Sequence, residues 1–323
     1  MTSGIVTAAA EGRRSRTDRT EPGRAALEHA IVQAVAYADV FDYPLTVDEI
    51  HRYLIGFAAS RAAVRAALAT PRLVPDILSR SGRYITLAGR ESAVDTRRRR
   101  AAVAAEYWQR AVRYGHLIGN LPFVRMVAVT GALAMDNIAD GDIDYLVITE
   151  PGRLWLCRAL VVGLVRSAAF RGTELCPNYF LSEQALVLSE RNLFTAHEVA
   201  QMVPLSGIET YQRLRSLNQW TSTYLPNAGG PPRRIAPVNA RPGRVHRILE
   251  QTLRSRICSP FERWEMARKM RKLGARGNGH AEAAFGPDWC KGHFGDHGQL
   301  TLNRYEQRMH VIDGILTGAE SAK

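Results

Sequence analysis

Two aspartates separated by one residue, Asp142 and Asp144, are the side chains of this sequence best suited to chemistry on phosphate. They begin the run 142–149, which predicts a β-strand, so both side chains point to one face with their Cβ atoms roughly 7 Å apart. Carboxylates this close repel each other unless a cation lies between them. A magnesium ion, or two ions about 3.5–4 Å apart, would relieve the repulsion and polarise a phosphoryl group. We therefore predict a Mg²⁺ or Mn²⁺ site at this pair.

The residues before the pair are suited to binding phosphate. The β-branched run Val124–Val129 predicts a buried strand, and Gly131 follows it closely. Glycine lets the chain turn tightly, and the backbone amides from Ala132 onward can bind phosphate at a helix N-terminus. The spacing predicts that the phosphate site and the carboxylates lie on neighbouring strands.

Two runs of the sequence resemble the signature of the polymerase-β-type nucleotidyltransferase superfamily: Thr130-Gly131-Ala132-Leu133-Ala134 and Asp142-Ile143-Asp144-Tyr145-Leu146-Val147-Ile148. The resemblance covers about residues 123–150 and extends loosely to about residue 225. It implies a strand, a Gly-Ser turn that binds triphosphate, a short helix, and two magnesium-binding aspartates on a second strand. A third carboxylate on a later strand activates the attacking hydroxyl in that family. The resemblance assigns the turn to Gly131 and the metal ligands to Asp142 and Asp144.

Two positions differ from the family pattern. Ala132 stands where the family has serine, which leaves backbone amides alone to bind phosphate. On the later strand, Asn178 stands where the family has aspartate, and an amide can ligate a metal but cannot act as a base. Glu174 and Glu183 are alternative sources of the base.

The predicted function is transfer of a nucleoside monophosphate from a nucleoside triphosphate to an acceptor hydroxyl. The net charge of +12 favours RNA, or DNA, as a partner over a small molecule or a protein. The alternative is a non-catalytic regulator that binds nucleotide or nucleic acid with a degenerate core, and Ala132 and Asn178 point to it. The aspartate pair favours the enzyme, because a scaffold has no need to hold two repelling acids together.

The predicted fold class is α/β (α+β): a polymerase-β-like nucleotidyltransferase core with an N-terminal winged helix and a C-terminal helical region. The expected domains are a disordered tail, a winged helix-turn-helix, the core, a Pro/Gly linker and a basic helical domain. Their predicted bounds are 1–24, 25–92, 93–226, 227–243 and 244–323.

The winged-helix prediction rests on three short helical patterns, a capping box at Thr46-Val47-Asp48-Glu49, and an alternating run over 77–87 around Ser81-Gly82. If this unit binds DNA, the third helix enters the major groove and a wing arginine reaches phosphate. The arginines concerned are Arg61 and Arg65 on the helix and Arg80 or Arg83 on the wing. Packing or contact with another protein is the alternative. The run Arg97–Arg100 predicts either a solvated helix start or a phosphate-contacting patch.

Beyond the motif, periodicity predicts a series of further elements. Helices are expected at 95–116, 151–170, 192–202, 208–224, within 245–273, and near 302–316, and strands at 178–181 and 185–188.

The sequence offers further candidate sites in its C-terminal third. Cys290, His293 and His297, with His280 nearby, have zinc-ligand types, although a loop is the alternative. Lys291 and His293 would instead reach phosphate if this segment folds over the active site. A polar and aromatic cluster, Asn218, Gln219, Trp220 and Tyr224, suits either stacking on a base or helix packing.

The four cysteines are far apart and form no CxxC pair, which predicts reduced thiols in a cytoplasmic protein. The most apolar run, 154–170, contains Arg158 and Arg166 and is shorter than the ~20 apolar residues of a membrane span. No membrane partner or export signal is therefore expected, and the oligomeric state is left open.

Overall fold

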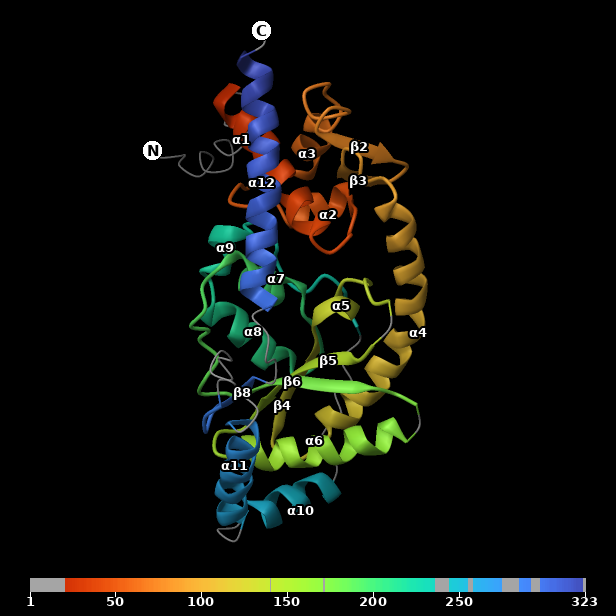
Figure 1. Ribbon diagram of the computed structural model, residues 1–323. Coiled ribbons are helices and arrows are strands. Elements are labelled where there is room, and N and C mark those ends of the chain that lie inside the picture. The colour runs from red at the N-terminus through yellow and green to blue at the C-terminus, as the bar shows by residue number, and fades with distance from the viewer. Residues whose placement is uncertain are drawn as a thin grey trace, which may run out of the picture. The chain divides into compact units, whose positions relative to one another are not determined.

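The computed structural model describes residues 21–139, 141–170, 172–235, 244–254, 258–274, 285–291 and 297–321. Over these residues the protein is a mixed α/β structure with twelve helices and two sheets (Figure 1). Internal contacts divide the chain into two compact units. The first comprises the described residues of 1–97, 222–229 and 303–323, and the second those of 98–221 and 230–302. In this division the described residues 303–321 belong with the N-terminal residues, whereas the domain prediction groups them with 244–323.

The first unit contains a three-stranded antiparallel sheet in the order β1-β3-β2. Its elements are α1 (Glu21–Asp39), β1 (Leu45–Thr46), α2 (Val47–Arg52), α3 (Arg61–Ala67), β2 (Leu78–Ser81), β3 (Tyr84–Leu87) and most of α12 (His297–Ser321). The predicted capping box is present: Thr46 Oγ1 accepts from the Glu49 amide, and the Glu49 carboxylate accepts from the Thr46 amide. The predicted hairpin is also present, with Gly82 at φ +61° in the turn between β2 and β3.

Helix α12 completes the core of the first unit. Tyr305, Met309 and Ile312 are buried on one side of it. Tyr305 makes an edge-on ring contact with Tyr37 of α1, and Arg308 pairs with Asp39 at 2.7 Å. A helix that contributes three apolar side chains to a core cannot be removed without exposing that core.

The second unit is built on a five-stranded sheet in the order β7-β4-β5-β6-β8, in which only β5 and β6 are parallel. The strands are β4 (Val124–Val129), β5 (Ile143–Thr149), β6 (Leu175–Ser182), β7 (Val203–Ser206) and β8 (Trp289–Lys291). The helices are α4 (Ala93–Gly119), α5 (Gly131–Ala134), α6 (Leu154–Ala169), α7 (Leu193–Gln201), α8 (Ile208–Leu217), α9 (Thr221–Tyr224), α10 (Arg244–Leu253) and α11 (Cys258–Gly274). Helices α4, α9 and α12 each contribute residues to both units.

Alternation along the central strands produces a core on each face of this sheet. Val127 and Val129 pack in a cluster with residues of α4 and α6, whereas Met126 and Ala128 pack in a second cluster with residues of α7 and α8. Along β5, Tyr145 and Val147 belong to the α4/α6 cluster, and Leu146 and Ile148 belong to the other. Both faces of the strands are therefore covered, as continuous apolar runs in a central strand require.

The predictions for β4, β5, β6 and their helices hold within a few residues, but two others are wrong. Residues 185–188 form no strand; the outer strands are β7 and β8, which the sequence analysis missed. The helix expected over 208–224 breaks at Asn218, which is fully buried. Its side-chain amide donates to the carbonyl oxygens of Leu186 and Leu214, and its side-chain oxygen accepts from the Leu188 amide. These bonds hold the 185–188 segment as a loop.

The described part of the Pro/Gly segment, 226–235, makes hydrogen bonds and an ion pair with other parts of the chain. In the first unit, the Asn227 amide donates to the carbonyl oxygens of His51 and Ala59. In the second unit, Arg233 pairs with Asp136. Residues 236–243 lie outside the described part of the chain.

Candidate active site

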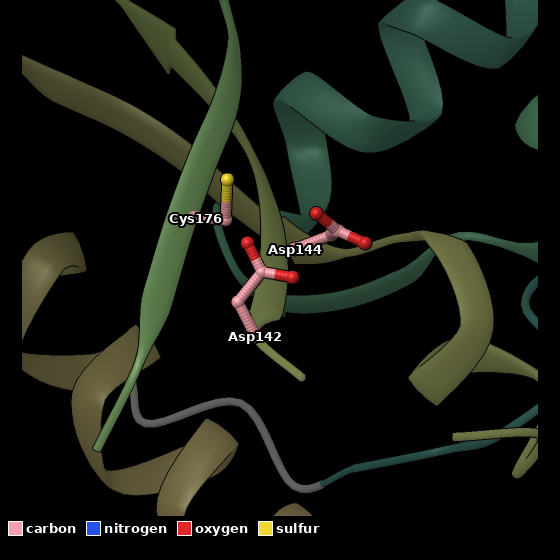
Figure 2. Close-up of side chains that lie close together, drawn as sticks. All are labelled: Asp142, Asp144 and Cys176. Atoms are coloured by element: carbon pink, nitrogen blue, oxygen red, sulfur yellow. The ribbon is translucent and has the colours of Figure 1, made fainter. Parts of the chain in front are cut away.

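Asp142, Asp144 and Cys176 form the candidate site (Figure 2). Each offers one ligand atom, a carboxylate oxygen or the sulfur, and these atoms all lie within 4.8 Å of one another. Asp142 is exposed and directly precedes β5, while Asp144 and Cys176 are partly buried. Among the residues that the structure describes, this is the group of His, Cys, Asp and Glu side chains with the spacing of a metal site.

The pairing of β5 with β6 brings Cys176 to the carboxylates. The strands are parallel, and Asp144 lies opposite Cys176. The register then shifts, so that Leu146 lies opposite Tyr179. The sequence predicts that this strand begins at Asn178 and assigns that residue to the site. Asn178 does lie on β6, but its side chain is outside the described residues, and the sulfur that lies within 4.8 Å of an oxygen of each aspartate belongs to Cys176.

Gly131 lies directly beside Asp144. Strand β4 pairs antiparallel with β5, Val129 lies opposite Tyr145, and the Thr130 amide donates to the Asp144 carbonyl oxygen at 3.1 Å. Gly131 has φ +64°, and a Cβ atom there would lie 2.4 Å from Asp144 Oδ2. The first amides of the short helix α5, including that of exposed Ala132, have no acceptor within the helix. The turn and the carboxylates therefore lie on neighbouring strands.

Replacing Gly131 by alanine should weaken divalent-cation binding at this site. The added Cβ would push the Asp144 carboxylate aside, and a left-handed φ is strained for alanine. We expect at least about a tenfold loss of Mn²⁺ affinity by calorimetry, the scale on which ligand-orienting contacts act. Gly163→Ala is the control, because a Cβ there meets nothing within 4 Å on helix α6. Equal Mn²⁺ affinities in the two variants would contradict this role for Gly131.

The connection between α5 and β5 is fixed by Asp136. Its carboxylate accepts from Trp108 Nε1 at 2.6 Å and from the Arg233 guanidinium at 2.6 and 2.9 Å. The guanidinium carbon of Arg233 lies 4.4 Å from the centre of the Trp108 ring. No local pattern in the sequence predicts these contacts, because the three residues are far apart in the chain. They hold the segment that leads from the glycine turn to the carboxylates.

The two glutamates predicted as alternative general bases for the attacking hydroxyl lie outside the metal-ligand group. Neither Glu174 nor Glu183 belongs to it, and Glu183 lies 4.0 Å from Arg213. Lys291, predicted to bind phosphate, forms an ion pair of 3.0 Å with Glu190 at the sheet edge. The charge of Lys291 also acts on Glu198 of α7, where burial nevertheless raises the carboxyl pKa to about 7.

The other candidates have structural roles where they are described. Cys290 is buried in the α4/α6 core and lies opposite Phe180, while His280 and His293 fall outside the described residues. Trp220 donates through Nε1 to the Asn218 side chain. These contacts favour packing over base stacking for the cluster around Asn218.

The donor set of the site fits magnesium only in part. Mg²⁺ binds one or two carboxylates together with substrate phosphates, so Asp142 and Asp144 suit it. A thiol does not, because Mg²⁺ is a hard cation that requires oxygen ligands.

No family model, curated protein or solved structure matches this chain. The geometry of the site therefore carries any assignment of function. Among the described helices, none combines the length and the apolar character needed to cross a membrane.

Proposed function

We propose that the protein is a metal-dependent nucleotidyltransferase that moves a nucleoside monophosphate from a nucleoside triphosphate to an acceptor hydroxyl. The observation that carries the proposal is the approach of the Gly131 turn to the carboxylate pair Asp142 and Asp144 across neighbouring strands. A cation and a polyphosphate together would need two neighbouring acids beside a glycine turn whose first helix amides have no acceptor within the helix.

The arrangement of elements supports the same proposal. Strand β4, the short helix α5 and strand β5 follow one another in the order that the resemblance to polymerase-β-type nucleotidyltransferases implies. Helix α6 and strand β6 come next, and β6 supplies the third side chain of the site. Fold alone does not establish an activity, so the site residues carry the weight.

In this proposal each part of the chain has a defined task. Asp142 and Asp144 hold the cation, and the first amides of α5 bind the triphosphate. A divalent cation held there would neutralise charge and polarise the phosphoryl group under attack. The contacts of Asp136 with Trp108 and Arg233 keep the turn in register with the carboxylates. Positioning and electrostatic stabilisation account for most catalysis in phosphoryl transfer.

We propose a nucleic acid, RNA before DNA, as the acceptor or partner. The first unit has the element order α1-β1-α2-α3-β2-β3, the order of a winged helix, and Arg65, Arg80 and Arg83 are exposed on its third helix and hairpin. Arg61 is paired with Asp48 and so is less suited to phosphate. The net charge of +12 supports a polyanionic partner.

Calorimetry with each of the four ribonucleoside triphosphates in Mg²⁺ tests the proposal. We expect micromolar binding of one of them, weakened by more than about 100-fold in Asp142→Asn/Asp144→Asn, since direct ligands matter more than outer contacts. Glu106→Gln/Glu209→Gln is the control, because it removes the same charge from two exposed helix positions. Binding of no triphosphate, or equal binding by both double variants, would refute the proposal.

A non-catalytic binding protein is the second candidate, and the thiol of Cys176 beside the carboxylates favours it, together with Ala132. A degenerate core would bind nucleotide or nucleic acid without transfer. Binding of duplex DNA that weakens steeply with salt, without incorporation of labelled nucleotide into any RNA or DNA, would support this candidate.

A further inference from the structure

We propose that Asp142, Asp144 and Cys176 together form a site for a thiophilic divalent cation of the zinc type, rather than a magnesium site completed by a third oxygen. This inference rests on the proposed function only in assigning a cation to the two aspartates. The identity of the third ligand, and hence the choice of metal, comes from the β5–β6 register that brings the sulfur to the carboxylates.

The distances suit such an ion. In tetrahedral zinc sites with bonds of about 2.0–2.2 Å to oxygen and about 2.3 Å to sulfur, ligand atoms lie about 3.5 Å apart. The three ligand atoms here lie within 4.8 Å of one another. Side-chain rotations that bring the ligand atoms about 1 Å closer to one another would therefore give zinc geometry. Backbone pairing of Asp144 with Cys176 holds the two strands that carry the ligands.

The chemistry of the ligands sets the preference. Thiolate is a soft ligand that favours zinc over magnesium, and the order of divalent affinities favours zinc over manganese. Cysteine binds such a cation as the thiolate, so the proton of the thiol goes to solvent on binding. Three protein ligands leave a fourth position for water or a phosphate oxygen, as in catalytic zinc sites.

Cys176 differs from the other described thiols. Cys157 and Cys290 are buried in the α4/α6 core, and burial raises the pKa of both thiols, which keeps them protonated. Cys176 is partly exposed and lies beside two carboxylates. Cys157 and Cys290 therefore provide matched controls for the role of a sulfur at the site.

The test is Co²⁺ binding to the full-length chain, with Co²⁺ as the spectroscopic stand-in for Zn²⁺. We expect a sulfur-to-cobalt charge-transfer absorption in the near ultraviolet that saturates at one equivalent. Cys176→Ser should abolish it, Asp142→Asn/Asp144→Asn should weaken Co²⁺ binding by at least about tenfold, and Cys290→Ala should leave it unchanged. An absorption that survives Cys176→Ser, or Co²⁺ binding with no such absorption, overturns the inference.

A second variant tests the preference itself. Cys176→Asp supplies the third oxygen and should shift the ratio of Mg²⁺ to Zn²⁺ affinity towards Mg²⁺ by at least about tenfold in competition calorimetry. An unchanged ratio means that the third side chain does not ligate the cation. The two proposals can fail separately. If only the zinc-type site is wrong, triphosphate binding that depends on Mg²⁺ and on Asp142 and Asp144 would persist in Cys176→Ser.

Discussion

Glu198→Gln should be more stable than the wild-type protein by about 3 kcal/mol near pH 7, and the difference should vanish near pH 4.5. Burial raises the Glu198 carboxyl pKa to about 7 against the opposing charge of Lys291. Ionising this group therefore costs more in the folded state than in the unfolded state. The cost is absent below the unfolded pKa and complete above the folded pKa, so stability falls as the pH rises between the two.

The neighbouring residue acts in the opposite direction. Burial lowers the pKa of His197 from 6.5 to about 4. The hydrogen bond between its Nδ1 and the Leu193 carbonyl oxygen, 3.0 Å long, opposes this shift only in part. Below pH 6.5 the unfolded chain takes up a proton that the folded state does not, so stability is lost as the pH falls towards 4. The two effects nearly cancel in the wild-type protein, whose stability should change little across this range on their account.

Urea denaturation of the wild type and three variants between about pH 4.5 and pH 7 measures the two effects. Relative to the wild type, Glu198→Gln should lose stability on acidification and His197→Gln should gain it, each by about 3 kcal/mol. Hydrogen exchange in α7 locates the change in the second unit. Glu209→Gln, an exposed change on α8, should follow the wild type. Parallel curves for all four proteins would show that neither side chain is ionised differently on folding.

Arg97→Met should destabilise the first unit by about 3 kcal/mol or more, at the lower end expected for a broken buried ion pair. Arg97 is only 8% exposed, and its guanidinium binds both carboxylate oxygens of Glu49 at 2.6 and 2.9 Å. It also lies 3.9 Å from the Tyr43 ring centre and donates to the Pro44 carbonyl oxygen. Methionine would leave the Glu49 carboxylate partly buried without its cation.

The same contact controls the ionisation of Glu49. Burial raises its pKa, but the bonds and charge of Arg97, with two bonds from Thr46, outweigh burial and lower it. The stabilisation from Arg97 is present above the unfolded pKa of 4.5 and is lost as the pH falls below it. Arg97→Met should remove this part of the acid sensitivity.

Chemical denaturation with hydrogen exchange over α2 checks the prediction. Arg99→Met is the control, because Arg99 is an exposed member of the same arginine run and surface changes usually cost less than about 0.5 kcal/mol. The double variant Arg97→Met/Glu49→Met should recover part of the loss, since both charges are then removed. Equal losses for Arg97→Met and Arg99→Met would mean that the ion pair contributes nothing specific.

Short-range features were predictable from the sequence. The capping box at Thr46 and Glu49 joins groups three residues apart, and the hairpin around Gly82 depends on a tight local turn. The apolar run of β4 and the i, i+2 spacing of Asp142 and Asp144 gave the central strands and the paired carboxylates. Each signal is local, because its interacting groups lie within a few residues of one another.

Other features depended on contacts between distant residues. The arginine run predicts a solvated helix start or a phosphate-contacting patch, yet its first residue, Arg97, is buried and pairs with Glu49. Glu262 of α11 accepts from the Trp155 and Leu156 amides at the start of α6, whose own Arg153 provides no side-chain cap. No pattern within either segment indicates such a partner.

The candidate site shows the same division. The sequence by itself determined the two carboxylates and the glycine turn, because a period of two along one strand fixes which side chains share a face. Only the tertiary structure decided the third side chain. Placing Cys176 beside the carboxylates requires the register of β6 against β5, including its irregularity after Asp144. Register between strands far apart in sequence is set by packing across the whole sheet, so no local pattern contains it.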